Sequence, residues 1–133
     1  MNRPNSGLIK EWIWKADGDF EAATTLFKSG KKKKVLYVIA FHCQQALEKY
    51  LKALLICRGI KPLKTHDLIQ LLNMVTKKDP FLIAVEKDLH ILNPFSVAFR
   101  YPGEDIELAE VKDGIQALKR VSKILKKRIR EFI

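Results

Sequence analysis

The 133-residue chain has few cysteines, glycines and prolines, and it lacks any long apolar run. Two cysteines cannot supply the disulfide framework of a small secreted domain, and six glycines and five prolines exclude a collagen-like or low-complexity chain. No apolar run approaches the ~18 residues that suggest a membrane span, and the first seven residues lack the apolar core of a signal peptide. We therefore expect a cytoplasmic protein with no membrane segment.

The sequence also lacks the residue spacings that bind metals. Cys43 and Cys57 fall in one expected helix at a separation of about 21 Å, which is beyond disulfide reach. Three isolated histidines and the absence of HExxH and CxxC patterns provide no metal site. We therefore expect no metal and no cofactor, and we interpret both cysteines as buried, reduced thiols.

What the sequence does have is enough apolar residues for a core and a large positive charge. Hydrophobic residues make up 47% and charged residues 30%, so we expect residues 1–133 to fold as a single compact domain. The 25 Lys and Arg against 15 Asp and Glu give a formal net charge of +10. This charge favours encounters with nucleic acid, nucleotides or acidic partners, although a solvated coat of lysines explains it equally well.

Apolar residues recur at helical spacing, and no segment shows the alternation of a strand. We therefore expect an all-α fold, an up-and-down bundle of about five helices. The expected helices cover about residues 7–28, 35–57, 66–77, 81–92 and 106–132. Glycine or proline follows most of these segments, Thr65 is expected to cap the third helix, and Leu8 begins the inward face of the first. Residues 93–105 are expected to be irregular but held on the core by their apolar side chains.

One face of the second expected helix is polar. At about 100° per residue, four side chains fall in a sector less than a quarter-turn wide, and we call them the polar stripe: His42, Gln45, Lys49 and Lys52. Two ammonium groups, an amide and an imidazole could bind a phosphate or a nucleotide. An exposed helix face explains the same spacing, and spacing alone favours it. Gln44 falls on the apolar side of the helix, where we expect a buried hydrogen bond.

Two residues outside this helix are further candidates. His66 lies at the expected start of the third helix, where free backbone N–H groups favour anions, although a local packing role is the alternative. Arg100 lies between two aromatic residues in an apolar loop, where a charge requires a partner. That partner is either a carboxylate, Glu48 or Asp105, or a phosphate.

The last expected helix is basic and amphipathic. Its polar face carries Lys112, Lys119, Lys123, Lys126 and Arg130. This face could lie on nucleic acid or on an acidic protein, and a solvated surface is the default interpretation. The opposite, apolar face is needed by the bundle, which argues against insertion into a membrane.

Several segments together resemble the HEPN (higher eukaryotes and prokaryotes nucleotide-binding) domain family. They are residues 40–55 (AFHCQQALEKYLKALL), Gly59, Pro62, Thr65-His66-Asp67-Leu68 and Arg100-Tyr101-Pro102. The resemblance covers about the whole chain and implies a helical bundle that forms a homodimer. It also implies that the protein acts with a separate minimal nucleotidyltransferase, often as a toxin–antitoxin pair.

The resemblance does not extend to the catalytic motif of the family. Many relatives are metal-independent ribonucleases that use an Arg and a His separated by four to six residues. No histidine follows Arg100, and seven residues separate Arg58 from His66, so the activity is not carried over. The resemblance implies instead that the polar stripe and Glu48 line a groove for nucleotides or RNA, with His66 and Arg100 near it.

These patterns leave three hypotheses. In the first, a HEPN protein binds nucleotide or RNA phosphate through the polar stripe and Arg100, and it acts with a nucleotidyltransferase. In the second, it is a metal-independent ribonuclease with a non-standard site, in which His66 is the general base and Arg100 stabilises the phosphate. In the third, it is a non-catalytic dimeric interaction module whose polar stripe packs against a second subunit.

Overall fold

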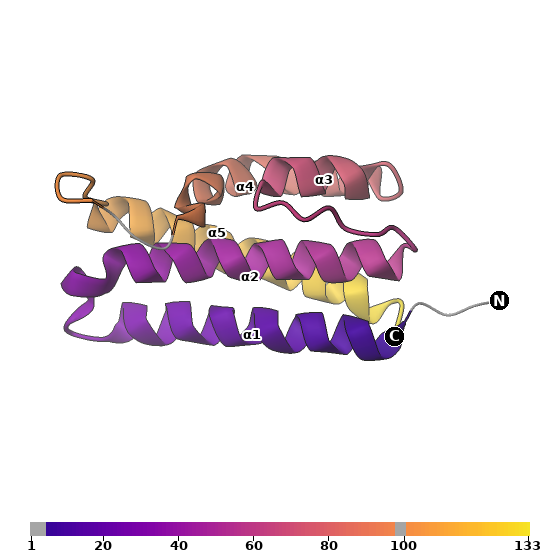
Figure 1. Cartoon of the computed structure of the whole chain (residues 1–133), viewed down its shortest axis with the longest axis horizontal. Helices are drawn as coiled ribbons and strands as arrows, with labels where there is room; N and C mark the ends of the chain where they lie inside the picture. Colours follow the sequence, from indigo (N-terminus) through magenta and orange to yellow (C-terminus); the bar gives the residue numbers. More distant parts are fainter. Residues whose placement is uncertain (1–4, 98–100) are drawn as a thin grey trace.

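The computed structural model describes residues 5–97 and 101–133, and in these residues all regular structure is helical. The α-helices are α1 (Ser6–Lys28), α2 (Leu36–Cys57), α3 (Leu68–Thr76), α4 (Glu86–Leu92) and α5 (Leu108–Arg130). Helices α1 and α2 run antiparallel, α3 and α4 lie on the opposite side of α2 from α1, and α5 runs behind α2 (Figure 1). The prediction of an all-α bundle of about five helices is confirmed.

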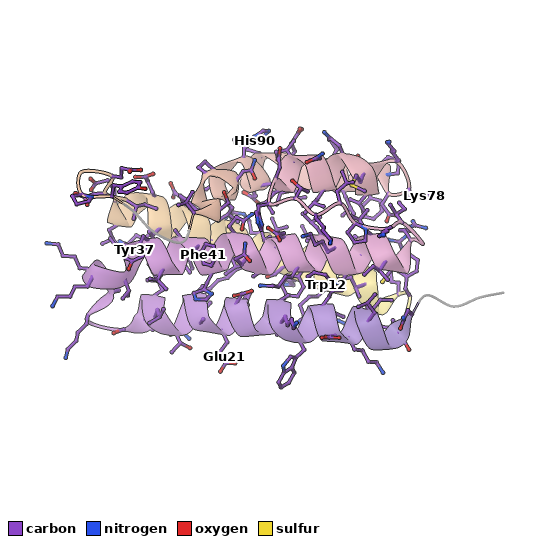
Figure 2. The ribbon with its side chains drawn as sticks, viewed as in Figure 1. Trp12, Glu21, Tyr37, Phe41, Lys78 and His90 are labelled. Carbon is purple, nitrogen blue, oxygen red and sulfur yellow. The ribbon has the colours of Figure 1, made fainter. Side chains whose placement is uncertain are left out.

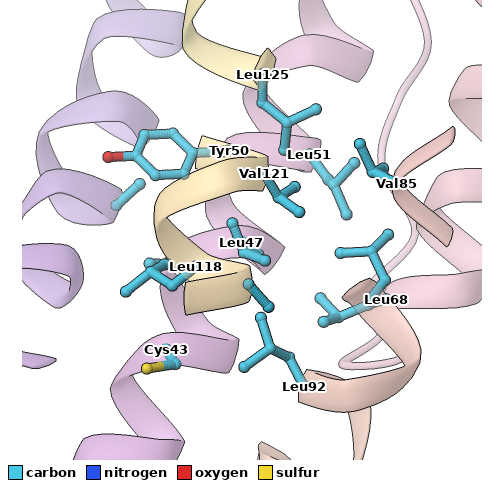
Figure 3. Packing of buried hydrophobic residues seen from close by; sticks show 14 of the residues in the cluster. Cys43, Leu47, Tyr50, Leu51, Leu68, Val85, Leu92, Leu118, Val121 and Leu125 are labelled. Atoms are coloured by element: carbon cyan, nitrogen blue, oxygen red, sulfur yellow. The ribbon is translucent and has the colours of Figure 1, made fainter. Parts of the chain in front are cut away.

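Helix α2 is the centre of the fold, because it contacts α1, α3 and α5. Its leucines meet those of α5 and α3 in one core, where Figure 3 shows Leu47, Leu51, Leu68, Leu118, Val121 and Leu125. Fully burying one leucine side chain contributes about 2 kcal/mol to folding, so this seam supplies much of the stability. Ala46 and Ala53 on α2 are fully buried with Ala16 and Ala23 on α1, and their small size lets the two helices approach closely.

The ends of the long helices follow from local hydrogen bonds. Asn5 caps α1 by accepting from the Leu8 backbone N–H at 3.1 Å, so the helix begins at Ser6, close to its predicted start. Gly59 follows α2 with a φ of 73°, and the Gly59 and Ile60 N–H groups each donate to a carbonyl of the last turn at 2.9 Å. This arrangement is a Schellman motif, and it confirms the predicted end of α2.

Three details of the predicted helices are wrong: the cap of α3, the form of the fourth helix, and the residue that begins the buried face of α1. Thr65 does not cap α3: Asp67 does, accepting from the N–H groups of Ile69 at 2.9 Å and Gln70 at 3.3 Å. Asp67 is the residue directly before α3, so its carboxylate reaches these amides, and the Thr65 hydroxyl instead accepts from the Asp67 N–H in the preceding turn. His66 therefore precedes the helix. Burial tends to raise the pKa of Asp67, but its hydrogen bonds outweigh this effect, so the pKa lies below its ordinary value.

The segment predicted as the fourth helix forms two helices: a 3₁₀ helix at Pro80–Val85, followed by α4. Leu82 and Val85 are both buried at a spacing of three residues, which a 3₁₀ helix places on one face. In α1, Leu8 is exposed and its neighbour Ile9 is buried instead, because Ile9 shares a face with the buried alanines one and two heptads later.

Buried Asp79 joins three parts of the chain at one end of the bundle. It accepts from Arg58 Nε at 2.9 Å, at the end of α2, and from an Arg128 guanidinium nitrogen at 2.8 Å, on α5. The hydrogen bonds from Arg58, and the one from Arg128, hold the pKa of Asp79 below its ordinary value against the effect of burial. Both guanidinium groups also stack within about 5 Å of the Phe132 ring centroid.

Residues 93–96 form a 3₁₀ helix whose Phe95 is buried, as expected for a loop held on the core. Gly114 of α5 makes room for it, because a Cβ there would lie 3.1 Å from the Phe95 ring. No helix in the described part of the chain is long and apolar enough to cross a membrane.

Candidate functional site

The polar stripe of α2 faces α1, where one carboxylate joins two of its members. Asp19 lies on the inward side of α1 and accepts from His42 Nδ1 at 2.8 Å and from the Lys49 ammonium. Since a carboxylate only accepts, the Nδ1 atom of His42 carries the proton. Both donors remain partly exposed, so this end of the stripe is open to solvent.

Lys52 occupies a different environment from Lys49. Its ammonium donates to Glu48 Oε2 at 3.1 Å and lies 5.6 Å from the ring centroid of Trp12. Trp12 lies between α1 and α2, where it covers this part of the stripe (Figure 2). Lys52 is therefore buried as an ion pair, and a ligand would reach it only after displacing these partners.

The glutamines connect the two ion pairs. Gln45 donates to the Gln44 side-chain oxygen at 2.8 Å and accepts from Lys49 at 3.4 Å. Gln44 is completely buried and donates to the His66 carbonyl at 2.7 Å. The predicted buried hydrogen bond of Gln44 is confirmed, and it holds the segment before α3 against α2.

Glu48 and His66 form a carboxylate–imidazole pair at the edge of the same network. The His66 Nδ1 atom lies 2.8 Å from Glu48 Oε1; the Glu48 side chain is 5% exposed and the His66 side chain is 72% exposed. The carboxylate fixes the proton on Nδ1, so Nε2 of the neutral ring is the acceptor. Within residues 5–97 and 101–133, no partner of Nε2 is found, and this atom is available to a ligand.

The structure thus brings the whole polar stripe together with Glu48 and His66. Two lysines are balanced by two carboxylates, so the network can exchange its internal acceptors for oxygens of an incoming anion. Arg100, the remaining predicted member of the site, lies outside the described residues. Next to it along the chain, Tyr101, Pro102 and residues 104–108 line a hollow of about 840 Å³ that also borders Lys32, Lys33 and Lys34.

A second carboxylate of α1, Asp17, links α1 to α5. It accepts from the Lys126 ammonium at 3.0 Å and from the Tyr50 hydroxyl. Burial and this hydrogen bond raise the pKa of Tyr50, so the phenol stays protonated. Burial also raises the pKa of Cys43 to about 12 and that of Cys57 to about 11, so neither thiol is a nucleophile near neutral pH.

No metal centre accompanies these side chains. In the part of the chain that the structure describes, no group of three or more His, Cys, Asp or Glu side chains could hold a metal ion. The side chains gathered here can donate hydrogen bonds to anions and can transfer a proton at an imidazole.

Comparison with models of known protein families shows to which family the chain belongs. A model of the HEPN domain matches residues 9–131, nearly the whole length. The chain belongs to the HEPN domain family. No curated protein and no solved structure matched it at the level that we required. Membership of the HEPN family points to a nucleotide- or RNA-related function, which agrees with the hydrogen-bonding chemistry of the network.

In this HEPN protein, Asp19 of the first helix also fits the family resemblance, but the sequence did not assign it to the site, where it joins two members of the stripe. A signal for it exists, because Asp19 falls between Ala16 and Ala23 on the inward face of α1, where a charge requires a partner. The pairing of Glu48 with His66 had no such signal, since the two residues lie in different segments and meet only in the folded chain.

Proposed function

We propose that this HEPN protein binds the phosphate groups of a nucleotide or of RNA at the polar stripe of α2. The observation that carries the proposal is that His42 and Lys49 already converge on the two oxygens of one carboxylate, Asp19. Donors that converge on a carboxylate are also spaced for phosphate oxygens. Without ligand, Asp19 occupies these donors; a bound phosphate takes its place, and Asp19 turns to solvent.

The other stripe residues have supporting parts in this proposal. Gln45 adds a neutral donor beside Lys49, and Lys52 keeps the neighbouring Glu48 compensated so that it does not repel the phosphate. Arg100 enters the site on the family resemblance alone, as a further positive charge. The net charge of +10 steers anionic ligands toward the molecule.

The proposal includes two protein partners that the resemblance implies. We expect a homodimer, and we expect a separate minimal nucleotidyltransferase that acts with it as a toxin–antitoxin-like pair. Sedimentation of the purified chain tests the dimer, and co-purification with a minimal nucleotidyltransferase encoded beside it tests the second partner. A folded dimer that binds no nucleotide or RNA would support a non-catalytic interaction module instead.

Titration of the purified protein with ATP, GTP and a short RNA at two salt concentrations tests the binding site. Lys49→Gln should weaken binding about tenfold, because it removes one charged hydrogen bond, and it should lower the salt dependence by about one released counterion. Lys87→Gln removes the same charge from the exposed surface of α4 and serves as the control. Equal affinities of the two variants would contradict the assignment.

A second candidate function is metal-independent RNA cleavage, which the Glu48–His66 pair favours. In this reaction Nε2 of His66 takes the proton of a ribose 2′-hydroxyl, and the 2′-oxygen forms a bond to the adjacent phosphorus. The bond from that phosphorus to the 5′-oxygen breaks, and the departing oxygen takes a proton from water. Glu48 keeps the imidazole in the tautomer that this step requires.

Cleavage of RNA in the presence of a metal chelator tests this candidate. His66→Ala should abolish the cleavage, and Glu48→Gln should reduce it, because the amide no longer fixes the proton on Nδ1. His90→Ala, at an exposed histidine of α4, is the control. Cleavage that survives His66→Ala would exclude the proposed base.

A further inference from the structure

Helix α5 presents a row of cations, most of which make no ion pair in the described part of the chain. The row, which we call the cationic row, consists of Lys112, Lys119, Lys123, Lys126 and Arg130. In the described part of the chain, Lys126 pairs with Asp17, and the other four members are exposed and make no ion pair. With a rise of about 1.5 Å per residue, the row extends about 27 Å along the helix.

The cationic row opposes the stability of α5. Like charges one turn apart destabilise a helix by a few tenths of a kcal/mol for each pair, and no acidic residue lies within the row. Arg120 lies beside the row and makes two hydrogen bonds to Asp88 at 2.8 and 3.1 Å. The fold therefore compensates this neighbouring cation and, within the row, Lys126 alone of the described residues.

An exposed aromatic side chain lies at the end of this row. Trp14 of α1 is 79% exposed. It lines a groove of about 280 Å³ between α1 and the end of α5, together with Lys10, Ile13, Asp17, Lys126, Ile129, Arg130 and Ile133. The one carboxylate of this lining, Asp17, is paired with Lys126. A tryptophan beside cations in an apolar groove provides the two contacts that an unpaired nucleotide requires: a flat surface for the base and positive charge for the phosphates.

We propose that the cationic row and Trp14 form a surface for single-stranded RNA. Phosphates lie along Lys119, Lys123 and Arg130, and an unpaired base stacks on Trp14. Duplex RNA fits less well, because its bases are stacked on one another and cannot cover the indole. The proposal rests on the RNA-related function proposed above, but it uses none of the polar stripe, so the two sites can be tested separately.

Tryptophan fluorescence tests the stacking directly. The chain has two tryptophans, so Trp12→Phe leaves Trp14 as the reporter. We expect an oligouridine of about 12 nucleotides to quench this fluorescence, and we expect Trp14→Ala to weaken binding of the oligouridine about tenfold. Because Trp14 is exposed, its removal should leave the fold intact, which circular dichroism checks. No quenching, or unchanged affinity of Trp14→Ala, would overturn the proposal.

Charge variants separate this surface from the stripe. Lys123→Gln/Arg130→Gln should lower the salt dependence of oligouridine binding by about two released counterions. Lys77→Gln/Lys87→Gln, at exposed positions just after α3 and in α4, should not. Lys123→Gln/Arg130→Gln should leave the affinity for ATP unchanged. Lys49→Gln should weaken the binding of ATP but should not change the quenching of Trp14 by oligouridine. Loss of Trp14 quenching by oligouridine in Lys49→Gln, with quenching retained in Lys123→Gln/Arg130→Gln, would overturn the proposal. Equal binding of duplex RNA or of polyglutamate would overturn it too.

Discussion

At the scale of single residues, carboxylates determine how charge is arranged in this bundle. Asp19 accepts hydrogen bonds at the open end of the stripe, and Glu48 accepts them at the buried end. Asp79 accepts hydrogen bonds from Arg58 and Arg128. Each of these carboxylates accepts from more than one side chain. Removal of any one leaves at least two donors unpaired, so its effect on stability or binding should exceed that of an exposed ion pair.

Asp79→Asn should lower the free energy of unfolding by about 2 kcal/mol at neutral pH. Breaking a buried pair costs about 3–5 kcal/mol, and the arginine partners here are partly exposed, which reduces the effect. The pKa of folded Asp79 lies below the ordinary value of 3.8, so its stabilisation is complete above that value and is lost as the pH falls through the folded pKa. Wild type and variant should therefore converge in acid.

Chemical denaturation from neutral pH to about pH 3 measures this difference. Glu131→Gln is the matched control, because Glu131 pairs with the same Arg128 but is exposed, and its loss should change the stability by less than about 1 kcal/mol. A difference between Asp79→Asn and wild type that stays constant with pH would contradict the role assigned to the carboxylate.

At the scale of elements, two glycines have opposite roles. Gly18 lies in the middle of α1, is exposed, and a Cβ there would meet nothing within 4 Å. Gly59 follows α2 with a φ of 73°, a left-handed conformation that side chains disfavour. Gly18→Ala should therefore stabilise the protein by about 0.5–1 kcal/mol, and Gly59→Ala should destabilise it by about 1–2 kcal/mol. Thermal unfolding measures both, and shifts of the same sign would contradict this assignment.

The elements were predictable from the sequence where a local signal sets them. Apolar periodicity predicted α5, and Gly59 predicted the end of α2, because both signals act within a few residues. The start of α3 was not predictable to the residue, since Thr65 and Asp67 both have capping side chains and only the folded turn decides between them. The 3₁₀ helix at Pro80–Val85 was not predicted, because the three-residue spacing of its buried side chains also fits an α-helix.

The candidate site was only partly predictable. Helical spacing alone gathers the polar stripe on one face of α2, as predicted. The acceptors of the stripe come from α1 and from α2 itself, and helix pairing, which no local pattern specifies, brings Asp19 to it. The exposed imidazole of His66 next to buried Glu48 likewise depends on how the segment before α3 lies over α2.

At the scale of the whole molecule, the proposals place two anion-binding surfaces on one small bundle. The polar stripe lies between α1 and α2 and is internally compensated, whereas in the cationic row on α5 only Lys126 pairs with a carboxylate of the described residues. A net charge of +10 attracts ligands to both surfaces. The stripe should therefore be selective, because a ligand must replace Asp19, and the row should respond mainly to charge and salt.

The affinity of Asp19→Asn for ATP and short RNA tests the central claim most directly. The amide removes the charge that competes for His42 and Lys49, so binding should tighten about fivefold, equivalent to about 1 kcal/mol. Glu21→Gln makes the same charge change on the outward side of α1 (Figure 2) and should leave the affinity nearly unchanged. A folded Asp19→Asn variant that binds no more tightly than Glu21→Gln would contradict phosphate binding at the polar stripe.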